Sequence, residues 1–396
     1  MISPAQDPYA SRTDRSSAII SRQDPVVYED GKYASALSDE QVGQYDRDGF
    51  LLLEDLFTPA EVRALSAEVE RMTRDPSIVR REEAITEPGS NAVRSIFLVH
   101  VLNPMLARLV RDPRLVNVAR QILGSEVYIH QSRANMKPGF KGKEFYWHSD
   151  FETWHVEDGM PSMRALSCSV LLTDNNECNG PLMLVPGSHR QFISCVGETP
   201  NEHYKQSLKK QEYGVPDPVS LQLLVEQGGI RTMTAKAGSV VFFDCNTMHG
   251  SNSNISPWPR ANVFMVYNSM ENTLNPPKYG LTPRPEHIAT RKGFKAVTPL
   301  DTLKLVGGWA TATYLARALS RAFFVSFRPP GARHFLYSLR HSPLVEPSPP
   351  CPLASSACIS IPSNPARASI SRNLPSIGQA SPMTGAGWWW TRGDSS

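Results

Sequence analysis

Two histidines and one aspartate, placed far apart in the chain, constrain this sequence more than any other feature. His148 and Asp150 stand two residues apart, and His249 follows about a hundred residues later. Two imidazoles and one carboxylate form the ligand set of non-haem Fe(II) oxygenases, in which they occupy one face of an octahedral iron. Alternate residues of a β-strand point to the same face, so the first two side chains could reach one ion. The fold must then bring a second strand, with His249, alongside.

These three residues are the predicted metal ligands and catalytic residues, and Arg260 adds to them. It lies eleven residues beyond His249 and precedes the apolar run 261–267. A guanidinium group can bind a carboxylate through two parallel hydrogen bonds. In oxygenases with this ligand set, a basic residue at this offset holds the distal carboxylate of 2-oxoglutarate. Arg260 is therefore the predicted anchor of that cosubstrate, and a solvated cation at the start of a strand is the alternative.

From Val127 to Met270 the pattern is that of β-strands. Short apolar runs such as Val170–Leu172, Val240–Phe243 and Val263–Val266 are separated by Gly, Asn and Pro. Many strands with a metal site between them indicate a jelly roll. We therefore predict a mainly β fold with flanking helices, a double-stranded β-helix of the cupin-type jelly-roll kind.

Two helices are predicted in the N-terminal half. Ser38–Gln41 and Thr58–Glu61 both have the pattern of a capping box, and the second has proline at the first helical position. Apolar residues after Thr58 recur at helical spacing, so an amphipathic helix should run from Thr58 to about Met72. Helices of this kind would cover one outer face of the sheets.

Longer blocks of the sequence resemble one family of enzymes. The first block, Phe145–Ala165, contains His148 and Asp150. Further blocks are Gln131–Phe140, Asn179–Met183 with Pro186–His189, and the segments around His249 and Arg260. From about residue 15 to about residue 300 the sequence resembles the ectoine hydroxylases, in the phytanoyl-CoA dioxygenase-like group of Fe(II)/2-oxoglutarate oxygenases. The resemblance implies hydroxylation of ectoine to 5-hydroxyectoine, with Fe(II) as cofactor, 2-oxoglutarate and O2 as cosubstrates, and succinate and CO2 as further products.

The resemblance also implies roles for side chains around the metal. Gln131, Arg133, Asn135 and Lys137 alternate along one segment, so on a strand they share a face. Without the resemblance this face could equally be solvated, and the nearby aromatic residues could be core. With it, 2-oxoglutarate would be bound, besides Arg260, by Lys137, Asn135, Ser251 and Phe97. Ectoine would be bound by Gln131, Arg133, Trp154, Phe243 and Phe264, with the aromatic rings around its cationic amidine.

Two other functions stay open at this point. A related oxygenase could hydroxylate another small zwitterion, such as proline, or an acyl-CoA. A jelly-roll module that has lost its iron would bind a ligand without catalysis. The intact set of His148, Asp150, His249 and Arg260 argues against the module.

The composition indicates a soluble enzyme. The formal net charge of the 396 residues is +3, so nothing in it requires nucleic acid or an acidic membrane as a partner. No run of 18 apolar residues is present, and the polar N-terminus lacks the apolar core of a signal peptide. The six cysteines show no CxxC motif, which favours reduced thiols. We predict a cytoplasmic protein with ectoine as its small-molecule substrate, and a homodimer is left open.

Three regions differ in composition. Residues 1–37 form a polar N-terminal segment that should extend over the body, and residues 38–300 form the predicted dioxygenase domain. Residues 301–396 contain 11 Pro, 15 Ser, nine Lys or Arg and three Asp or Glu, too little apolar surface to offset chain entropy. They extend beyond the usual end of the resembling family, so we predict a largely disordered extension. Within it, Leu303–Phe327 is apolar enough to form a helix.

Overall fold

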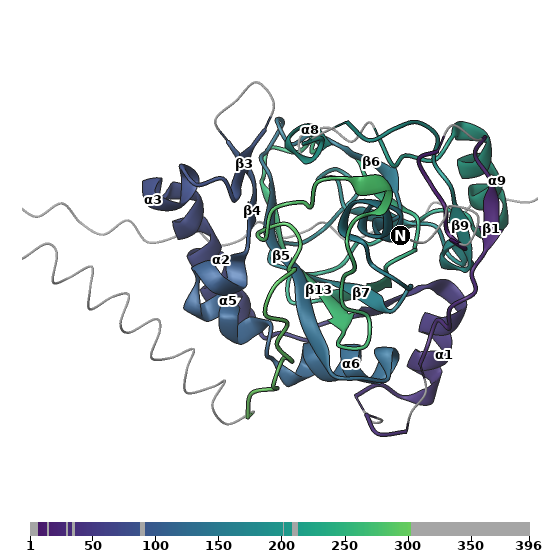
Figure 1. Cartoon of the computed structure of the whole chain (residues 1–396). Coiled ribbons are helices and arrows are strands. Elements are labelled where there is room, and N and C mark those ends of the chain that lie inside the picture. Colours follow the sequence, from purple (N-terminus) through teal and green to yellow (C-terminus); the bar gives the residue numbers. More distant parts are fainter. Residues whose placement is uncertain are drawn as a thin grey trace, which may run out of the picture. The chain divides into compact units, whose positions relative to one another are not determined.

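Two antiparallel β-sheets form the centre of the protein (Figure 1). The computed structural model describes residues 7–13, 16–28, 31–33, 36–87, 92–200, 202–207 and 213–301. The larger sheet has seven strands in the order β2 (Phe50–Leu53), β11 (Val240–Asp244), β7 (Ala165–Leu171), β13 (Arg260–Ser269), β5 (Val127–Lys137), β4 (Val93–Phe97) and β3 (Ala84–Thr86). The smaller sheet has four, in the order β10 (Arg231–Thr232), β8 (Leu182–Leu184), β12 (His249–Ser251) and β6 (Phe145–His148).

Apolar side chains from both sheets meet in one core cluster. Leu184 of β8 is buried in the same cluster as Phe243 of β11 and Phe264 of β13. Burial of each such side chain stabilises the fold by roughly 1.5–3 kcal/mol. Because the cluster draws on both sheets, they lie face to face, which is the arrangement of a jelly roll. The predicted double-stranded β-helix with flanking helices is therefore confirmed.

Helices cover the outer face of the larger sheet. The α-helices of the described residues are α1 (Asp39–Asp48), α2 (Pro59–Arg74), α3 (Pro76–Val79), α4 (Val99–Leu102), α5 (Pro104–Leu109), α6 (Pro113–Leu123), α7 (Asp150–Thr153), α8 (Tyr204–Ser207) and α9 (Pro218–Gly228). Both predicted capping boxes are present, at Ser38 and Thr58, and α2 runs two residues beyond Met72. Leu65 and Met72 of α2 are buried against the outer face of the sheet, in one cluster with Ile96 of β4. In Figure 1, α2 and α5 lie beside β3–β5.

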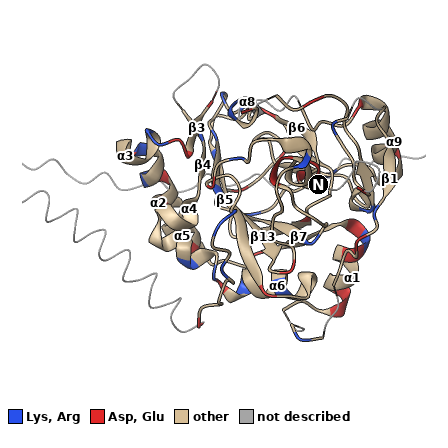
Figure 2. Cartoon of the chain, in the orientation of Figure 1, with Lys and Arg blue, Asp and Glu red and all other residues tan. Residues whose placement is uncertain are grey.

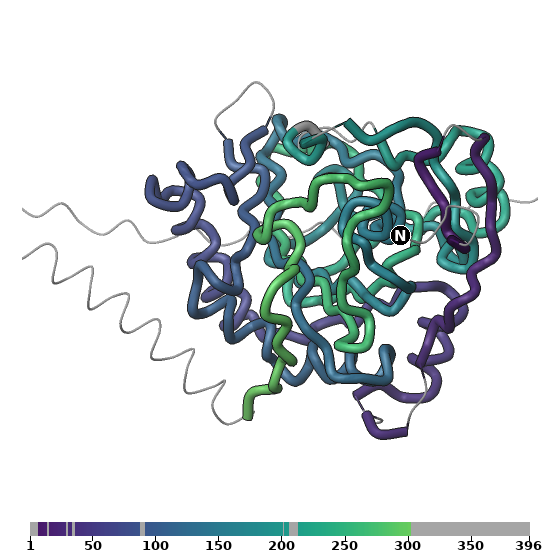
Figure 3. The backbone as a smooth tube through the Cα atoms, viewed as in Figure 1, coloured from purple at the N-terminus to yellow at the C-terminus, as the bar shows by residue number. Residues whose placement is uncertain are grey.

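The N-terminal segment is part of the packed body. β1 (Ile19–Ser21) pairs antiparallel with β9 (Gln191–Ile193). In Figure 3 this segment, in purple, accordingly runs beside a teal part of the chain. Tyr9 and Arg12 are buried. A segment that was predicted only to extend over the body therefore also contributes buried side chains to it.

The last described residues are anchored to the domain. The backbone N–H of Val297 donates to the carbonyl of Val127 at 2.7 Å, and that of Leu300 donates to the carbonyl of Arg111 at 2.8 Å. The predicted extension, apart from Asp301, and the predicted helix over Leu303–Phe327 lie outside the described residues.

The described surface carries charges of both signs. Figure 2 shows Lys and Arg interspersed with Asp and Glu, with an acidic group on α1. In the part of the chain that the structure describes, no helix combines the length and the hydropathy needed to cross a bilayer.

Candidate active site

The three predicted metal ligands come from the ends of three elements. β6 ends at His148, β12 begins at His249, and α7 begins at Asp150. The two histidines are direct cross-strand partners in the smaller sheet. The prediction that Asp150 continues the strand of His148 is wrong, because Ser149 caps α7 by accepting the backbone N–H of Glu152. The chain turns there, and Asp150 reaches the histidines from the first position of a helix.

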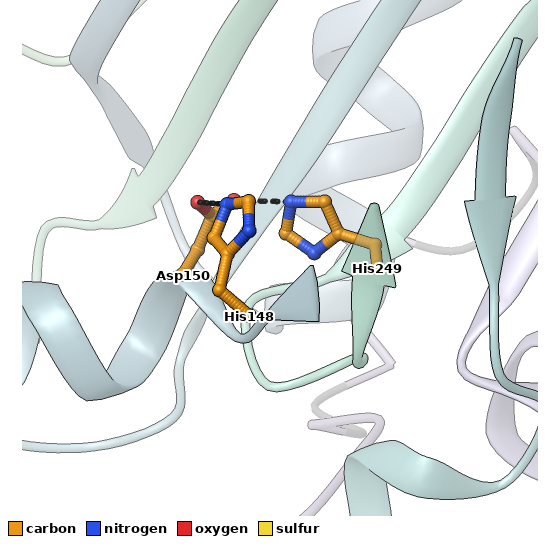
Figure 4. Close-up of side chains that lie close together, drawn as sticks. All are labelled: His148, Asp150 and His249. Carbon is orange, nitrogen blue, oxygen red and sulfur yellow. Dashed lines mark ion pairs between the residues drawn. The ribbon is translucent and has the colours of Figure 1, made fainter. Parts of the chain in front are cut away.

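The ligand atoms converge on one point, as Figure 4 shows. Nε2 of His148 lies 3.8 Å from Oδ1 of Asp150, and Nε2 of His249 lies 3.9 Å from Oδ2 of the same carboxylate. Two atoms bound to one ion at roughly 2.0–2.2 Å can lie at most roughly 4.4 Å apart, so both distances suit a shared ion. Among the residues that the structure describes, these three are the one cluster of potential metal ligands.

Both histidines present Nε2 to the site. Nδ1 of His148 lies 2.7 Å from the carbonyl oxygen of Tyr146, and Nδ1 of His249 lies 2.9 Å from that of Thr247. Because a carbonyl oxygen only accepts, each Nδ1 carries the proton and each Nε2 keeps a lone pair for a metal. Burial, followed by the neighbouring His249, lowers the pKa of His148 to about 3, which keeps its imidazole neutral. The donor set therefore fits a divalent ion.

Two buried cations lie together on adjacent strands of the larger sheet. Arg260, the first residue of β13, is the cross-strand partner of Lys137, the last residue of β5. Nζ of Lys137 donates to Oγ of Ser251 at 2.8 Å and to the carbonyl of Asn252. Nε of Arg260 has no hydrogen-bond partner among the described residues. Positive charge at this depth is costly unless an anion binds beside it, so this pair suits a carboxylate ligand.

The environment weakens both cations as proton binders. Burial, followed by the positive charge of Arg260, lowers the pKa of Lys137 to about 6. Burial, followed by the positive charge of Arg94, lowers the pKa of Arg260 to about 10.

The other two residues predicted to bind 2-oxoglutarate lie on strands of the same sheet. Asn135 of β5 accepts a hydrogen bond at Oδ1 from Ser95, at 2.8 Å, and Phe97 ends β4.

A cavity opens beside the metal ligands. Its lining residues are Gln131, Arg133, Phe145, His148, Asp150, Thr153, Trp154, Glu157, His203, Tyr213 and Arg284. Because two of the metal ligands are among them, a molecule in the cavity lies next to the ion. Three of the five residues predicted to bind the substrate, Gln131, Arg133 and Trp154, are also among them.

The predicted substrate residues differ in their surroundings. Nε2 of Gln131 donates to the carbonyl of Ile288 at 2.7 Å. The guanidinium of Arg133 lies 5.2 Å from the ring centre of Phe264 and 5.9 Å from that of Phe97. Phe243 and Phe264 are not among the lining residues and belong to the core cluster between the sheets. The ring of Phe243 lies 5.0 Å from that of His249, next to the metal site.

Six lining residues were not predicted: Phe145, Thr153, Glu157, His203, Tyr213 and Arg284. The first three lie within a few residues of His148 and Asp150, and this proximity was a usable signal. The last three lie outside the β-strands of the structure. No pattern in the sequence marks them.

Comparison with known proteins decides the class of this site. Residues 45–262 match the family model of phytanoyl-CoA dioxygenase (PhyH). An ectoine dioxygenase from Bordetella bronchiseptica is 89% identical over 306 residues, which make up 77% of this chain and 99% of that protein. The chain belongs to the phytanoyl-CoA dioxygenase family, among its ectoine dioxygenases. The resemblance seen in the sequence is thereby confirmed.

Further relatives are similar over most of their length. An ectoine dioxygenase from Sphingopyxis alaskensis is 54% identical over 286 residues, which make up 72% of this chain and 94% of that protein. Crystal structures of EctD from S. alaskensis, one with bound Fe and one with 2-oxoglutarate and 5-hydroxyectoine, match with a TM-score of 0.67 at 48% identity. Each match covers 74% of this chain and 98% of that chain. Membership of this family also confirms the predicted enzyme class, a dioxygenase.

Proposed function

We propose that this protein is an Fe(II)- and 2-oxoglutarate-dependent dioxygenase that hydroxylates ectoine to 5-hydroxyectoine, with release of succinate and CO2. The observation that carries the proposal is that His148 and Asp150 line the same cavity as Arg133 and Trp154. A substrate held by the last two would lie beside the metal. The relatives support the choice of substrate, because the ectoine dioxygenases match over nearly their whole length.

Iron would be held by His148, Asp150 and His249. Three ligands from one side leave the other coordination positions of the ion for 2-oxoglutarate and O2. When bound, the iron supplies the oxidising chemistry that couples decarboxylation of 2-oxoglutarate to hydroxylation of a C–H bond. The protein supplies geometry. Oγ of Ser167 donates to Oδ2 of Asp150 at 3.1 Å, and backbone carbonyls orient both histidines.

The distal carboxylate of 2-oxoglutarate would bind at Arg260 and Lys137. A planar guanidinium can form two hydrogen bonds with a carboxylate, so Arg260 is the proposed anchor. Ser251 already accepts a hydrogen bond from Lys137, and its position on β12 lies two residues beyond His249. We propose that Ser251 and Asn135 add hydrogen bonds and that Phe97 provides an apolar wall.

Ectoine carries a cyclic amidine cation and a carboxylate, and the cavity offers a counterpart to each. The cation would lie against Trp154, because a delocalised cation is attracted to an aromatic face. The carboxylate would bind Arg133, and Oε1 of Gln131 would accept a hydrogen bond from the amidine. Phe264 lies beneath the guanidinium of Arg133 and Phe243 beside His249, so we propose that both shape the site from behind.

The test is product formation by the purified protein with Fe(II), 2-oxoglutarate and O2. We expect ectoine-dependent succinate and 5-hydroxyectoine, and neither product from the His249→Ala variant. Turnover of proline or an acyl-CoA without turnover of ectoine would contradict the proposed substrate and favour a related oxygenase. Ligand binding without any consumption of 2-oxoglutarate would favour a binding module.

Assembly and location are proposed separately. We propose a cytoplasmic enzyme, on the basis of its modest net charge of +3. Homodimer formation stays a prediction that light scattering on the purified protein would test. Cell fractionation would test the location.

A further inference from the structure

One arginine of the N-terminal segment is buried against the wall of the substrate cavity. Only 4% of Arg12 is exposed, and its backbone has a φ of 56°, a left-handed conformation that is uncommon for a residue other than glycine. Its backbone N–H donates to the carbonyl of Cys195 at 2.7 Å. A strained residue persists only where its surroundings hold it in place.

The guanidinium of Arg12 is held by four side chains. Nε and Nη2 donate to the two carboxylate oxygens of Glu152 at 3.0 and 2.8 Å, and Nη1 pairs with Glu157. Nη2 also donates to Oγ1 of Thr153 at 3.0 Å, and Nη1 donates to Oγ1 of Thr199 at 2.9 Å. The two parallel hydrogen bonds between Arg12 and Glu152 fix the orientation of the Glu152 carboxylate as well as its position.

Three of these partners lie on the segment that carries the active site. Asp150 begins α7, and a π-helix (Trp154–Asp158) follows it directly. π-Helices are rare and are frequent at functional sites. Arg12 contacts Glu152 in α7 and Glu157 in the π-helix. It therefore bridges the junction between the two helical forms, next to Trp154.

The charge of Arg12 also acts on a second arginine of the cavity. Oε2 of Glu157 lies 3.8 Å from Nε of Arg284, and Nε of Arg284 donates to Oδ1 of Asp158 at 2.8 Å. Arg12 and Arg284 thus share the carboxylate of Glu157. Without Arg12, Arg284 would be the one cation left beside the Glu157 carboxylate among the described residues, and the electrostatic potential at this part of the cavity wall would become more negative.

Arg12 reaches the rim of the cavity as well. A Cβ atom on Gly214, which has a φ of 67°, would lie 2.5 Å from Nη2 of Arg12 and 2.5 Å from Oε2 of Glu152. The backbone at Gly214 is therefore packed directly on this ion pair. Tyr213, the preceding residue, lines the cavity.

We propose that Arg12 is a positioning residue for the substrate. It fixes the π-helix that carries Trp154 and Glu157 and supports the rim at Tyr213, so the N-terminal segment forms part of the substrate site. The inference rests on the proposed hydroxylation of ectoine. It assigns Arg12 no contact with the metal or with 2-oxoglutarate.

The test compares Arg12→Ala and Arg12→Lys with the parent enzyme. We expect KM for ectoine to rise by about tenfold or more, while KM for 2-oxoglutarate and the iron content stay near those of the parent. Lysine keeps the charge but lacks the planar guanidinium with its paired N–H donors, so Arg12→Lys should bind ectoine better than Arg12→Ala and less tightly than the parent enzyme. Guanidinium ion added to Arg12→Ala should lower KM for ectoine again, because it can occupy the site of the missing group. Calorimetric binding of ectoine gives a readout that does not depend on turnover.

Arg22→Lys is the matched control. Arg22 also lies in the N-terminal segment, and its side chain is 3% exposed and pairs with Asp244 at 2.8 Å, but neither residue lines the cavity. We expect Arg22→Lys to lower the melting temperature of the protein without changing KM for ectoine. An equal rise in KM for the Arg22 variant, or a parallel loss of iron and 2-oxoglutarate binding in both Arg12 variants, would overturn the proposal. So would an unchanged KM for ectoine. If Arg12→Ala does not fold, Arg12→Lys decides. A parent enzyme that does not hydroxylate ectoine would instead refute the proposed function.

Discussion

Arg260 and Lys137 face each other across β13 and β5, and only 3% and 1% of these residues are exposed. A positive charge on both residues at this depth would be poorly solvated, and the two charges would repel each other, so a bound carboxylate would stabilise the pair.

Arg260→Ala should weaken the binding of 2-oxoglutarate. Loss of one partner of a buried, hydrogen-bonded charge pair costs about 2–5 kcal/mol of binding free energy, so KM for 2-oxoglutarate should rise by about tenfold or more. KM for ectoine should change far less. Steady-state kinetics with each substrate varied in turn measures both effects. The exposed strand residue Arg231 offers a control, since Arg231→Ala should change neither constant. An unchanged requirement for 2-oxoglutarate would move the anchor to Lys137.

Binding of 2-oxoglutarate should take up a proton at Lys137. The pKa of this residue is lowered to about 6 by burial and then by Arg260, so its amine is mostly neutral at pH 8 in the free enzyme. A carboxylate beside it favours the charged form, so binding takes up about one proton and the affinity falls as the pH rises above 6. Calorimetry of the Mn(II)-loaded protein in buffers of different ionisation enthalpy measures the proton count.

The same shift has a defined sign for stability. Between about pH 6 and the ordinary pKa of 10.5, the unfolded chain binds more protons at Lys137 than the folded chain does. The cost of burying this charge is therefore full below pH 6 and is relieved as the pH rises. Lys137→Met should stabilise the metal-free protein most at pH 6 and should abolish the proton uptake. An exposed control, Lys236→Met, should do neither. Unchanged proton uptake in Lys137→Met would show that another group titrates.

Removal of any metal ligand should abolish iron binding and turnover together. In His249→Ala, two ligands remain and the open-faced site no longer forms, so we expect elemental analysis to find almost no bound iron. His155 provides the control, because it lies in the same block as His148 but contacts Asp7 and the carbonyl of Met160 instead. His155→Gln should keep one iron per chain. Full iron content in the His249 variant would contradict the assignment.

Truncation after Leu300 should leave iron binding and ectoine hydroxylation intact. The backbone up to this residue is hydrogen-bonded to the domain, and every proposed site residue precedes it. Activity per iron and solubility of the shortened chain measure the outcome. Loss of soluble, iron-binding protein would show that the segment from Leu303 to Phe327 belongs to the fold.

The parts of the site that local patterns encode could be predicted from the sequence. Strand alternation placed Gln131, Arg133 and Lys137 on one strand, β5, because the period of a strand is two residues. The capping boxes at Ser38 and Thr58 marked two helix starts for the same local reason.

Other parts of the site could not be predicted, because they depend on tertiary contacts. Asp150 was expected on a strand, but Ser149 starts a helix there. Arg284 lies outside any strand, and its carboxylate partner Asp158 is 126 residues away in the chain. The burial of Arg12 depends on Glu152, 140 residues away. The sequence around a single charged residue does not indicate which distant residue will pair with it in the folded chain.

The direct opposition of His148 and His249 on β6 and β12 has a consequence beyond catalysis. An ion bound by both side chains would cross-link two points of the chain about a hundred residues apart. Such a cross-link lowers the conformational entropy of the unfolded chain, as the closure of any long loop does. The iron would then stabilise the jelly roll as well as take part in the reaction. Cells short of iron would hold this enzyme in a form that is both inactive and easier to unfold, so its lifetime would follow the supply of the metal.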